Sequence, residues 1–242
     1  MCKNVCPVWH QCRVARAHLL LQSLQPSPAL DHRNTVRSCL LSVLSCLLTW
    51  LAVNHFIGTT AGGHVFPGAT LPWGSVKAGA DCDSRENQAG YVADESDIRG
   101  FSPLHDDGTG GSPSLGQFKL MPMYCVGGTA GGQCDAQEGR RQKRRVDGSQ
   151  AASPGYFKLG LINDVTVEIT ASHHAALYKF TFDKFKEGAD EKPVIAFDLS
   201  NDLLKSFSQG LIHLEHENDA VRVSGWGEFR PSFGGGNYKV SM

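Results

Sequence analysis

The sequence predicts an all-β protein folded as an antiparallel β-sandwich. The evidence for this prediction lies in the second half of the sequence. Short β-type runs follow one another from Gly155 onward. No long amphipathic helix separates them, which favours antiparallel pairing over a parallel sheet. The best helical candidate, Asn201–Ser208, is short. We expect strands at Tyr156–Ile162, Asp164–Thr170, Leu177–Phe182, Pro193–Ser200, Val221–Phe229 and Asn237–Met242.

The second of these runs has the pattern of a strand with one wet face. Val165, Val167 and Ile169 alternate with Thr166 and Glu168, which is the two-residue period of a half-buried strand. The Asn-Asp pair at the start of this run predicts a tight hairpin turn after the preceding strand.

Length and charge limit the classes of function. The 242 residues, 41% of them hydrophobic, can bury the core of one large all-β domain or two small ones. Lys and Arg number 23 against 24 Asp and Glu, for a formal net charge of -1. Nothing therefore marks the whole chain as a binder of nucleic acid or of an anionic membrane. An uncharged partner such as a sugar fits this composition.

The first 53 residues differ in character from the rest. They hold five of the eight cysteines and the apolar run Cys39–Val53. This run has the length of a secretory h-region, and Arg33 and Arg37 supply basic charge in front of it. We expect a leader at 1–53, with a signal or anchor segment that directs the chain to the secretory pathway or extracellular space. The alternative is that part of Met1–Arg37 is not natural sequence.

Two glycine-rich segments carry the functional signal, Val53–Asp81 and Gly100–Pro122. Neither has helical or strand periodicity. Dense Gly, Pro, His, Asp and Thr between short apolar runs is typical of ordered loops, where glycine permits positive φ and polar side chains meet a ligand.

These segments resemble the amino-terminal signature of glycoside hydrolase family 92, calcium-dependent exo-α-mannosidases. The first matches the family's VNxFIGT…GxxFPGAxxPFG block and the second its GFSxxHxSGTG block. A third match is GWGEFRPSFGGGNY at Gly225–Tyr238, against GxGTFRPSFGxGxY. The resemblance covers about Val53–Met242 and implies a sandwich of the galactose-mutarotase-like or supersandwich type.

In the family this sandwich precedes a large helical barrel that holds the catalytic carboxylates and most calcium ligands. The last run, Asn237–Met242, has the pattern of a strand with no turn residues or polar tail after it. We therefore expect the domain 54–242 to be truncated at its carboxyl end and the barrel to be absent. Calcium belongs to the full-length enzyme, and this chain alone is expected to bind none. Asp106-Asp107 is the one acidic pair in a signature loop and is no convincing acid and base, because adjacent side chains rarely face a substrate from opposite sides.

By the resemblance, the sandwich lends loops to one wall of the mannose pocket. His105 has two alternatives, contact with substrate or a hydrogen bond within its loop, and so does His64. Asp107 stands where the family has Ser. The matching positions for substrate binding are Gly62, Gly63, His64, Phe66, His105, Asp106, Gly108 and Thr109.

Three other features have competing interpretations. Trp73, in GATLPWG, replaces the family's Phe and is interpreted as a core or interface aromatic rather than a platform for sugar stacking. The His173-His174 doublet is a poor chelate if both residues lie on a strand. The basic run Gln137–Asp147 is either a solvated loop or a processing site, since Arg141–Arg144 has the R-x-K-R order that secretory endoproteases recognise.

Past the leader, Cys82, Cys125 and Cys134 remain. In a secreted chain one pair is expected to close, and Cys125 with Cys134 is favoured because they bracket a short flexible loop. No CxxC or HxxxH spacing indicates a zinc site.

The leading hypothesis is the non-catalytic amino-terminal domain of a secreted, inverting α-mannosidase, α-1,2-directed, that acts on mannose-containing glycans. Its second partner is the helical catalytic domain, without which the chain is expected to be inactive. The alternatives are a stand-alone carbohydrate-binding or interaction module and a non-functional truncated gene product.

Overall fold

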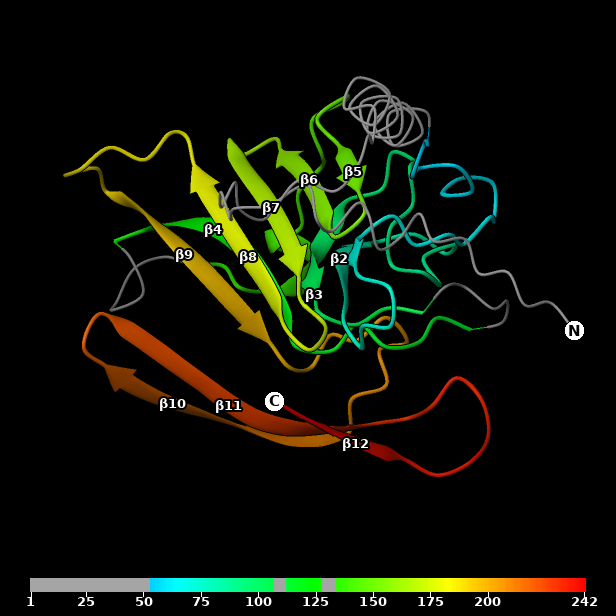
Figure 1. Cartoon of the computed structure of the whole chain (residues 1–242). Coiled ribbons are helices and arrows are strands. Elements are labelled where there is room, and N and C mark those ends of the chain that lie inside the picture. The colour runs from blue at the N-terminus through cyan, green and yellow to red at the C-terminus, as the bar shows by residue number, and fades with distance from the viewer. Residues whose placement is uncertain (1–52, 107–111, 128–133) are drawn as a thin grey trace, which may run out of the picture. The chain divides into compact units, whose positions relative to one another are not determined.

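The computed structural model describes residues 53–106, 112–127 and 134–242 (Figure 1). The expected leader, apart from its last residue, lies outside these described residues. Residues His55–Met242 form one compact unit. In the part of the chain that is described, no helix is both long and apolar enough to cross a membrane.

The first sheet has five antiparallel strands in the order β1-β2-β3-β4-β9. Strand β2 is buried over nearly its whole length, and every residue of β3 is buried. A sheet covered on both faces explains why this part of the sequence has no alternating pattern. The strands are β1 (Ala69–Thr70), β2 (Lys77–Cys82), β3 (Ile98–Ser102), β4 (Lys119–Val126) and β9 (Glu191–Asp198).

The second sheet is a four-stranded antiparallel meander, β5-β6-β7-β8. Val165, Val167 and Ile169 are buried while the residues between them are not, which confirms the predicted half-buried strand. Asp164 has a φ of 57° in the hairpin turn between β6 and β7. The strands are β5 (Ala151–Ser153), β6 (Tyr156–Leu161), β7 (Val165–Ala171) and β8 (Ala176–Phe182).

These two sheets form the sandwich, and the main hydrophobic core lies between them (Figure 1). Both contribute large side chains to this core. Members include Ile98, Phe101, Met121, Phe157, Leu159 and Val167. The predicted all-β antiparallel sandwich is thereby confirmed.

A third sheet, β10-β11-β12, consists of β10 (Gln209–Glu217), β11 (Ala220–Phe229) and β12 (Tyr238–Ser241). A second hydrophobic core, smaller than that of the sandwich, is formed by Phe118, Leu199 and Phe229, the last of which belongs to β11. The long β10-β11 hairpin runs below β9 in the view of Figure 1.

The helix expected at Asn201–Ser208 is wrong, because this stretch is turn and coil. The Asp202 carboxylate accepts hydrogen bonds from the backbone N–H groups of Ser206, at 2.7 Å, and Phe207, at 3.2 Å. Such side-chain bonds compete with helical ones. Lys205 also has a φ of 55°, in the left-handed region. Among the described residues, the one helix is α3 (Glu138–Arg141).

Candidate functional site

The first glycine-rich loop has a tight backbone. Ala61 and His64 have φ values of 51° and 53°, which non-glycine residues rarely adopt. The loop also brings backbone against backbone, since a Cβ on Gly63 would lie 2.2 Å from the carbonyl oxygen of Gly58. Glycine is therefore required at position 63 for this shape.

Glu86 holds the tip of this loop from outside it. Its Oε2 accepts a hydrogen bond of 2.9 Å from the backbone N–H of Gly62. Its backbone carbonyl lies 3.0 Å from Nδ1 of His64, which acts as the donor to this oxygen. Gly62 and Gly63 remain exposed and His64 is partly exposed. The backbone N–H of Gly63 donates to the carbonyl oxygen of Thr60 at 3.1 Å. Because the N–H groups of both glycines are engaged, a ligand can reach only their carbonyl oxygens and Nε2 of His64 on this part of the loop.

An aromatic contact joins the first loop to the second. The rings of Phe66 and His105 stack with centroids 5.2 Å apart and an interplanar angle of 26°. Glycines make room on both sides, because a Cβ on Gly68 would lie 2.3 Å from Phe66 and one on Gly90 would lie 2.3 Å from His105.

His105 is buried and hydrogen-bonded through both ring nitrogens. Nδ1 donates to the carbonyl oxygen of Lys77 at 2.8 Å, and Nε2 lies 2.7 Å from Oδ1 of Asp81 and 3.1 Å from Oγ of Ser102. Both ring nitrogens are therefore engaged within the protein, and neither is free for a ligand. Burial to 1% exposure favours the loop-holding alternative for His105 over direct contact with substrate.

Asp81 is shared between His105 and a second buried cation. Nζ of Lys119 lies 3.2 Å from Oδ2 of Asp81, and neither side chain is exposed. Burial alone would raise the pKa of Asp81, but the charges of Lys119 and His105 outweigh it and lower this pKa to about 2. Burial lowers the pKa of Lys119, against the opposing charge of Asp81. Asp81 is therefore a carboxylate that ties β2, β4 and the second loop together.

The second loop presents Asp106 next to this buried cluster. Asp106 is partly exposed and accepts a 3.0 Å hydrogen bond from Oγ of Ser114. Gly108 and Thr109 lie outside the described residues. In the described part of the two loops, the exposed groups can form hydrogen bonds with hydroxyls, and we find no paired acid and base there.

We find no candidate calcium site in the part of the chain that the structure describes. No group of three or more His, Cys, Asp or Glu side chains there could share an ion. The His173-His174 doublet lies in the turn between β7 and β8 rather than on a strand. There it packs on the first signature segment, with the backbone N–H of Ser75 donating to the carbonyl of His173 at 2.8 Å.

Trp73 is 99% exposed, so the core alternative for this side chain is wrong. Its φ is 62°, which non-glycine residues rarely adopt.

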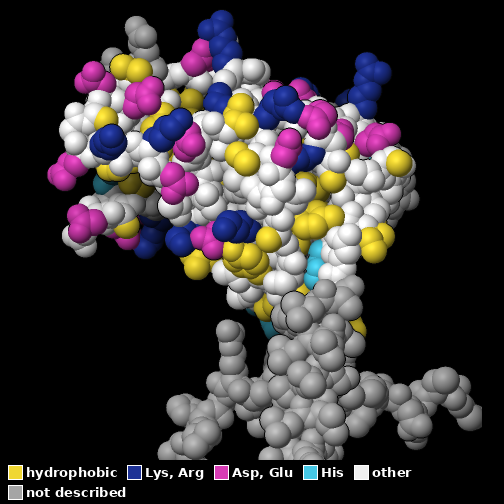
Figure 2. All heavy atoms as spheres, turned by 90° about the horizontal axis from the view of Figure 1, so that it is seen from above, with side chains coloured by type: hydrophobic (Ala, Val, Ile, Leu, Met, Phe, Trp, Pro, Cys, Tyr) yellow, Lys and Arg dark blue, Asp and Glu magenta, His cyan; other side chains and the backbone are white. Residues whose placement is uncertain are grey.

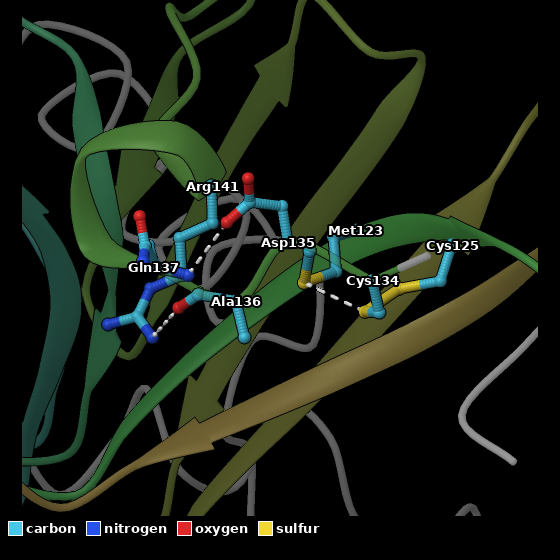
Figure 3. The surroundings of a disulfide bond; sticks show 7 residues. All are labelled: Met123, Cys125, Cys134, Asp135, Ala136, Gln137 and Arg141. Atoms are coloured by element: carbon cyan, nitrogen blue, oxygen red, sulfur yellow. Dashed lines mark hydrogen bonds between the residues drawn. A yellow bond between two sulfur atoms is a disulfide. The ribbon is translucent and has the colours of Figure 1, made fainter. Parts of the chain in front are cut away.

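Cys125 and Cys134 form a disulfide (Figure 3), and Cys82 is the free cysteine among the described residues. Burial raises the pKa of the Cys82 thiol to about 11. Oppositely charged side chains are interspersed on the face of the molecule in Figure 2. That surface agrees with a formal net charge of -1 and shows no broad field of one sign.

The supports of the two loops were not foreseen from the sequence: Asp81, Glu86, Ser102 and Lys119. A weak signal was available for two of them. Asp81 and Lys119 each interrupt a run of small or apolar residues, AGADC and FKLMP, where an ionisable side chain needs a buried partner.

Comparison with known proteins finds a matching family and a similar protein. A family model described as the glycosyl hydrolase family 92 N-terminal domain matches residues 52–242. An uncharacterized secreted glycosidase of Arthroderma benhamiae is 42% identical over 188 residues, which are 77% of this chain and 24% of that protein. The chain thus spans about a quarter of the length of this relative.

Two solved structures share the fold. One is a family 92 glycosyl hydrolase with a TM-score of 0.62 and 22% identity, over 78% of this chain and 25% of that one. The other is a family 92 α-mannosidase of Bacteroides thetaiotaomicron in complex with mannoimidazole. It has a TM-score of 0.58 and 28% identity, over 74% of this chain and 23% of the enzyme.

Proposed function

This chain belongs to the glycosyl hydrolase family 92 N-terminal domain family, and on that premise we propose that it is the non-catalytic amino-terminal domain of a secreted α-mannosidase. The enzyme removes α-1,2-linked mannose from glycans. Support comes from the secreted glycosidase that is 42% identical and from the similar α-mannosidase solved with mannoimidazole. Because the chain spans a quarter of its relative, a helical catalytic domain supplies the reacting carboxylates in this proposal.

The contribution of this domain is one wall of the mannose pocket. The observation that carries this role is the Phe66–His105 stack, which joins the two signature loops above the buried Asp81 carboxylate. On one loop, the carbonyl oxygens of Gly62 and Gly63 and Nε2 of His64 are the polar groups open to a ligand, since the N–H groups of both glycines are engaged. Sugar hydroxyls are recognised by such closely placed backbone and planar side-chain groups.

On the second loop, Asp106, Gly108 and Thr109 meet the sugar in this proposal. His105 acts from beneath as a positioning residue, because its ring is buried and both of its nitrogens are engaged. Phe66 fixes the distance between the loops through that ring.

Calcium enters the proposal only with the catalytic domain. A Ca²⁺ ion takes six to eight oxygen ligands, roughly, several of them carboxylates. The described residues of this chain hold no such group of acidic side chains. We therefore assign no calcium ligand to them and derive no step of the reaction through the ion.

A chimeric enzyme tests the proposal. Residues 55–242 of this chain replace the matching residues of the Arthroderma benhamiae glycosidase, and mannose release from α-1,2-mannobiose is measured against the parent enzyme. We expect the chimera to be active, and we expect Gly63→Ala to reduce its activity at least tenfold, roughly, because the loop must deform. Gly139→Ala is the control, since a Cβ there meets nothing within 4 Å.

Three outcomes contradict the proposal. A folded parent enzyme that releases no mannose from any α-mannobiose speaks against the mannosidase assignment. A chimera whose activity is the same in the Gly63→Ala and Gly139→Ala variants speaks against the pocket wall. Binding of mannobiose by the chain alone, in an inactive chimera, favours a carbohydrate-binding module instead.

A further inference from the structure

The basic segment at residues 137–147, here called the strap, passes from one sheet of the sandwich to the other. Lys143 forms a backbone bridge with Ile98 of β3, through hydrogen bonds of 2.8 and 3.2 Å. Arg145 forms the next bridge, with Leu161 of β6. Beside that bridge, the N–H of Ile162 donates to the carbonyl oxygen of Arg144 at 3.0 Å, and the N–H of Val146 donates to the carbonyl oxygen of Gly160 at 2.8 Å.

Two arginines of the strap point into the protein. Arg141 is 6% exposed and forms an ion pair with Asp198 of β9. It also donates to the carbonyl oxygen of Ala136 at 3.0 Å, as Figure 3 shows. Arg145 donates to the carbonyl oxygen of Val92 at 2.7 Å, and its guanidinium lies 5.4 Å above the ring of Tyr91.

The other two arginines point outward. Arg140 is 70% exposed and pairs with the exposed Asp135, and Arg144 is 54% exposed and pairs with Glu95. Inward-pointing and outward-pointing arginines thus both occur along the strap. The solvated-loop interpretation is wrong for Arg141 and Arg145, because their side chains pack against the protein.

We propose that the strap closes the sandwich and, by folding, hides the Arg141–Arg144 sequence from processing endoproteases, so that cleavage after Arg144 marks an open or misfolded domain. Such proteases bind an extended stretch of substrate through its backbone as well as its side chains. Here the backbone on both sides of Arg144 is already bonded to the two sheets. The side chain of Arg141, the first arginine of the motif, is buried against Asp198.

The proposal concerns the folded state of this chain and does not depend on the proposed glycan-binding role. It predicts that a properly folded secreted chain keeps the strap intact in spite of its R-x-K-R sequence. An exposed loop of the same sequence is cut instead, because cleavage then needs no opening of the domain.

The test compares the folded chain with its own strap as a free peptide. The 242-residue chain and a synthetic peptide of residues 137–147 are each treated with a proprotein convertase specific for Arg-X-Lys-Arg, and mass spectrometry follows the cut after Arg144. We expect cleavage of the chain to be at least a hundredfold slower, roughly, because the rate follows the population of the open form. Rates within about threefold of each other overturn the proposal.

A matched pair of variants leaves the recognition sequence unchanged. Asp198→Asn removes the partner of the buried Arg141, whereas Asp135→Asn removes the partner of the exposed Arg140. We expect cleavage after Arg144 to be about tenfold faster in the Asp198 variant and unchanged in the Asp135 variant, since only the first leaves a buried charge unpaired. Equal rates in the two variants contradict a strap held by Arg141.

Circular dichroism of each variant shows whether it folds. If Asp198→Asn does not fold, Arg145→Gln serves in its place, since it loses the bond to Val92 and lies outside the four-residue motif. Its rate is divided by that of a peptide with the same change. If this ratio of chain to peptide cleavage rates equals the ratio for the unmodified chain and unmodified peptide, the proposal is overturned.

Discussion

Nε2 of His105 lies 2.7 Å from Oδ1 of Asp81, and this contact anchors the second signature loop to the first sheet. The opposite oxygen of Asp81 faces Lys119. Phe66 then stacks on His105 and brings the first loop onto the same support. The shape of the proposed pocket wall thus depends on three buried ionisable groups, and their removal is the most direct way to test that dependence.

We expect Asp81→Asn to destabilise the fold by about 3–5 kcal/mol, because it leaves the Lys119 ammonium buried without a counter-charge. Urea unfolding, followed by circular dichroism, measures the change. The control is Glu217→Gln, which breaks an exposed pair with Arg222 and is expected to cost less than about 1 kcal/mol. Equal losses of unfolding free energy in the two variants would show that the buried ion pair stabilises the fold no more than the exposed one.

Acid should weaken the protein through the same carboxylate. The pKa of Asp81 is about 2 in the fold against 3.8 as its ordinary value. A lowered pKa means that the unfolded chain takes up a proton first as pH falls, so this stabilisation is full above about pH 4 and is lost between about pH 4 and 2. The amount is about 2 kcal/mol. Urea unfolding at several pH values measures it, and a slope in this interval that Asp81→Asn does not reduce contradicts the assignment to Asp81.

A strand with one buried and one exposed face is the easiest to predict from the sequence. In β7, buried Val165, Val167 and Ile169 alternate with more exposed neighbours, so the strand is readable from its period. Strands β2 and β3 are covered on both faces and contain Gly79 and Gly100, so they have the composition of a loop. Strand β10 was missed for the opposite reason, since nearly all of its residues are exposed.

The site was predictable to a similar degree. The motifs placed both loops in the sequence, but they did not indicate that His105, one of the matched positions, has a buried side chain. The supports come from β2 and β4, about forty residues apart in sequence, and only tertiary pairing brings Asp81 to Lys119. A charged residue within an apolar run is only a weak signal of burial until its partner is known.

Gly90→Ala is expected to disturb the second loop from behind. Gly90 has a φ of 84°, and a Cβ there would lie 2.3 Å from Cδ2 of His105. Gly188 is a matched control, because its φ is 86° and its Cβ would meet nothing within 4 Å. Both alanine variants carry the cost of left-handed backbone, about 1 kcal/mol, and only Gly90→Ala adds a steric clash of at least about 1–3 kcal/mol. Equal unfolding free energies would show that His105 moves freely away.

The free thiol gives an independent measure of how tightly this core is closed. Cys82 is fully buried and its pKa is raised to about 11, so in the folded chain at pH 8 it is almost wholly a thiol and out of reach of alkylating reagents. We expect peptide mapping after iodoacetamide treatment to find Cys82 unmodified in the native chain and modified in urea. Modification should also rise in Gly90→Ala, because the backbone N–H of Cys82 donates to the carbonyl of Gly90 at 2.9 Å, and a shift of that residue opens the path to the sulfur. Rapid labelling of Cys82 in the unmodified chain would mean that the sandwich opens near the signature loops far more often than its packing implies.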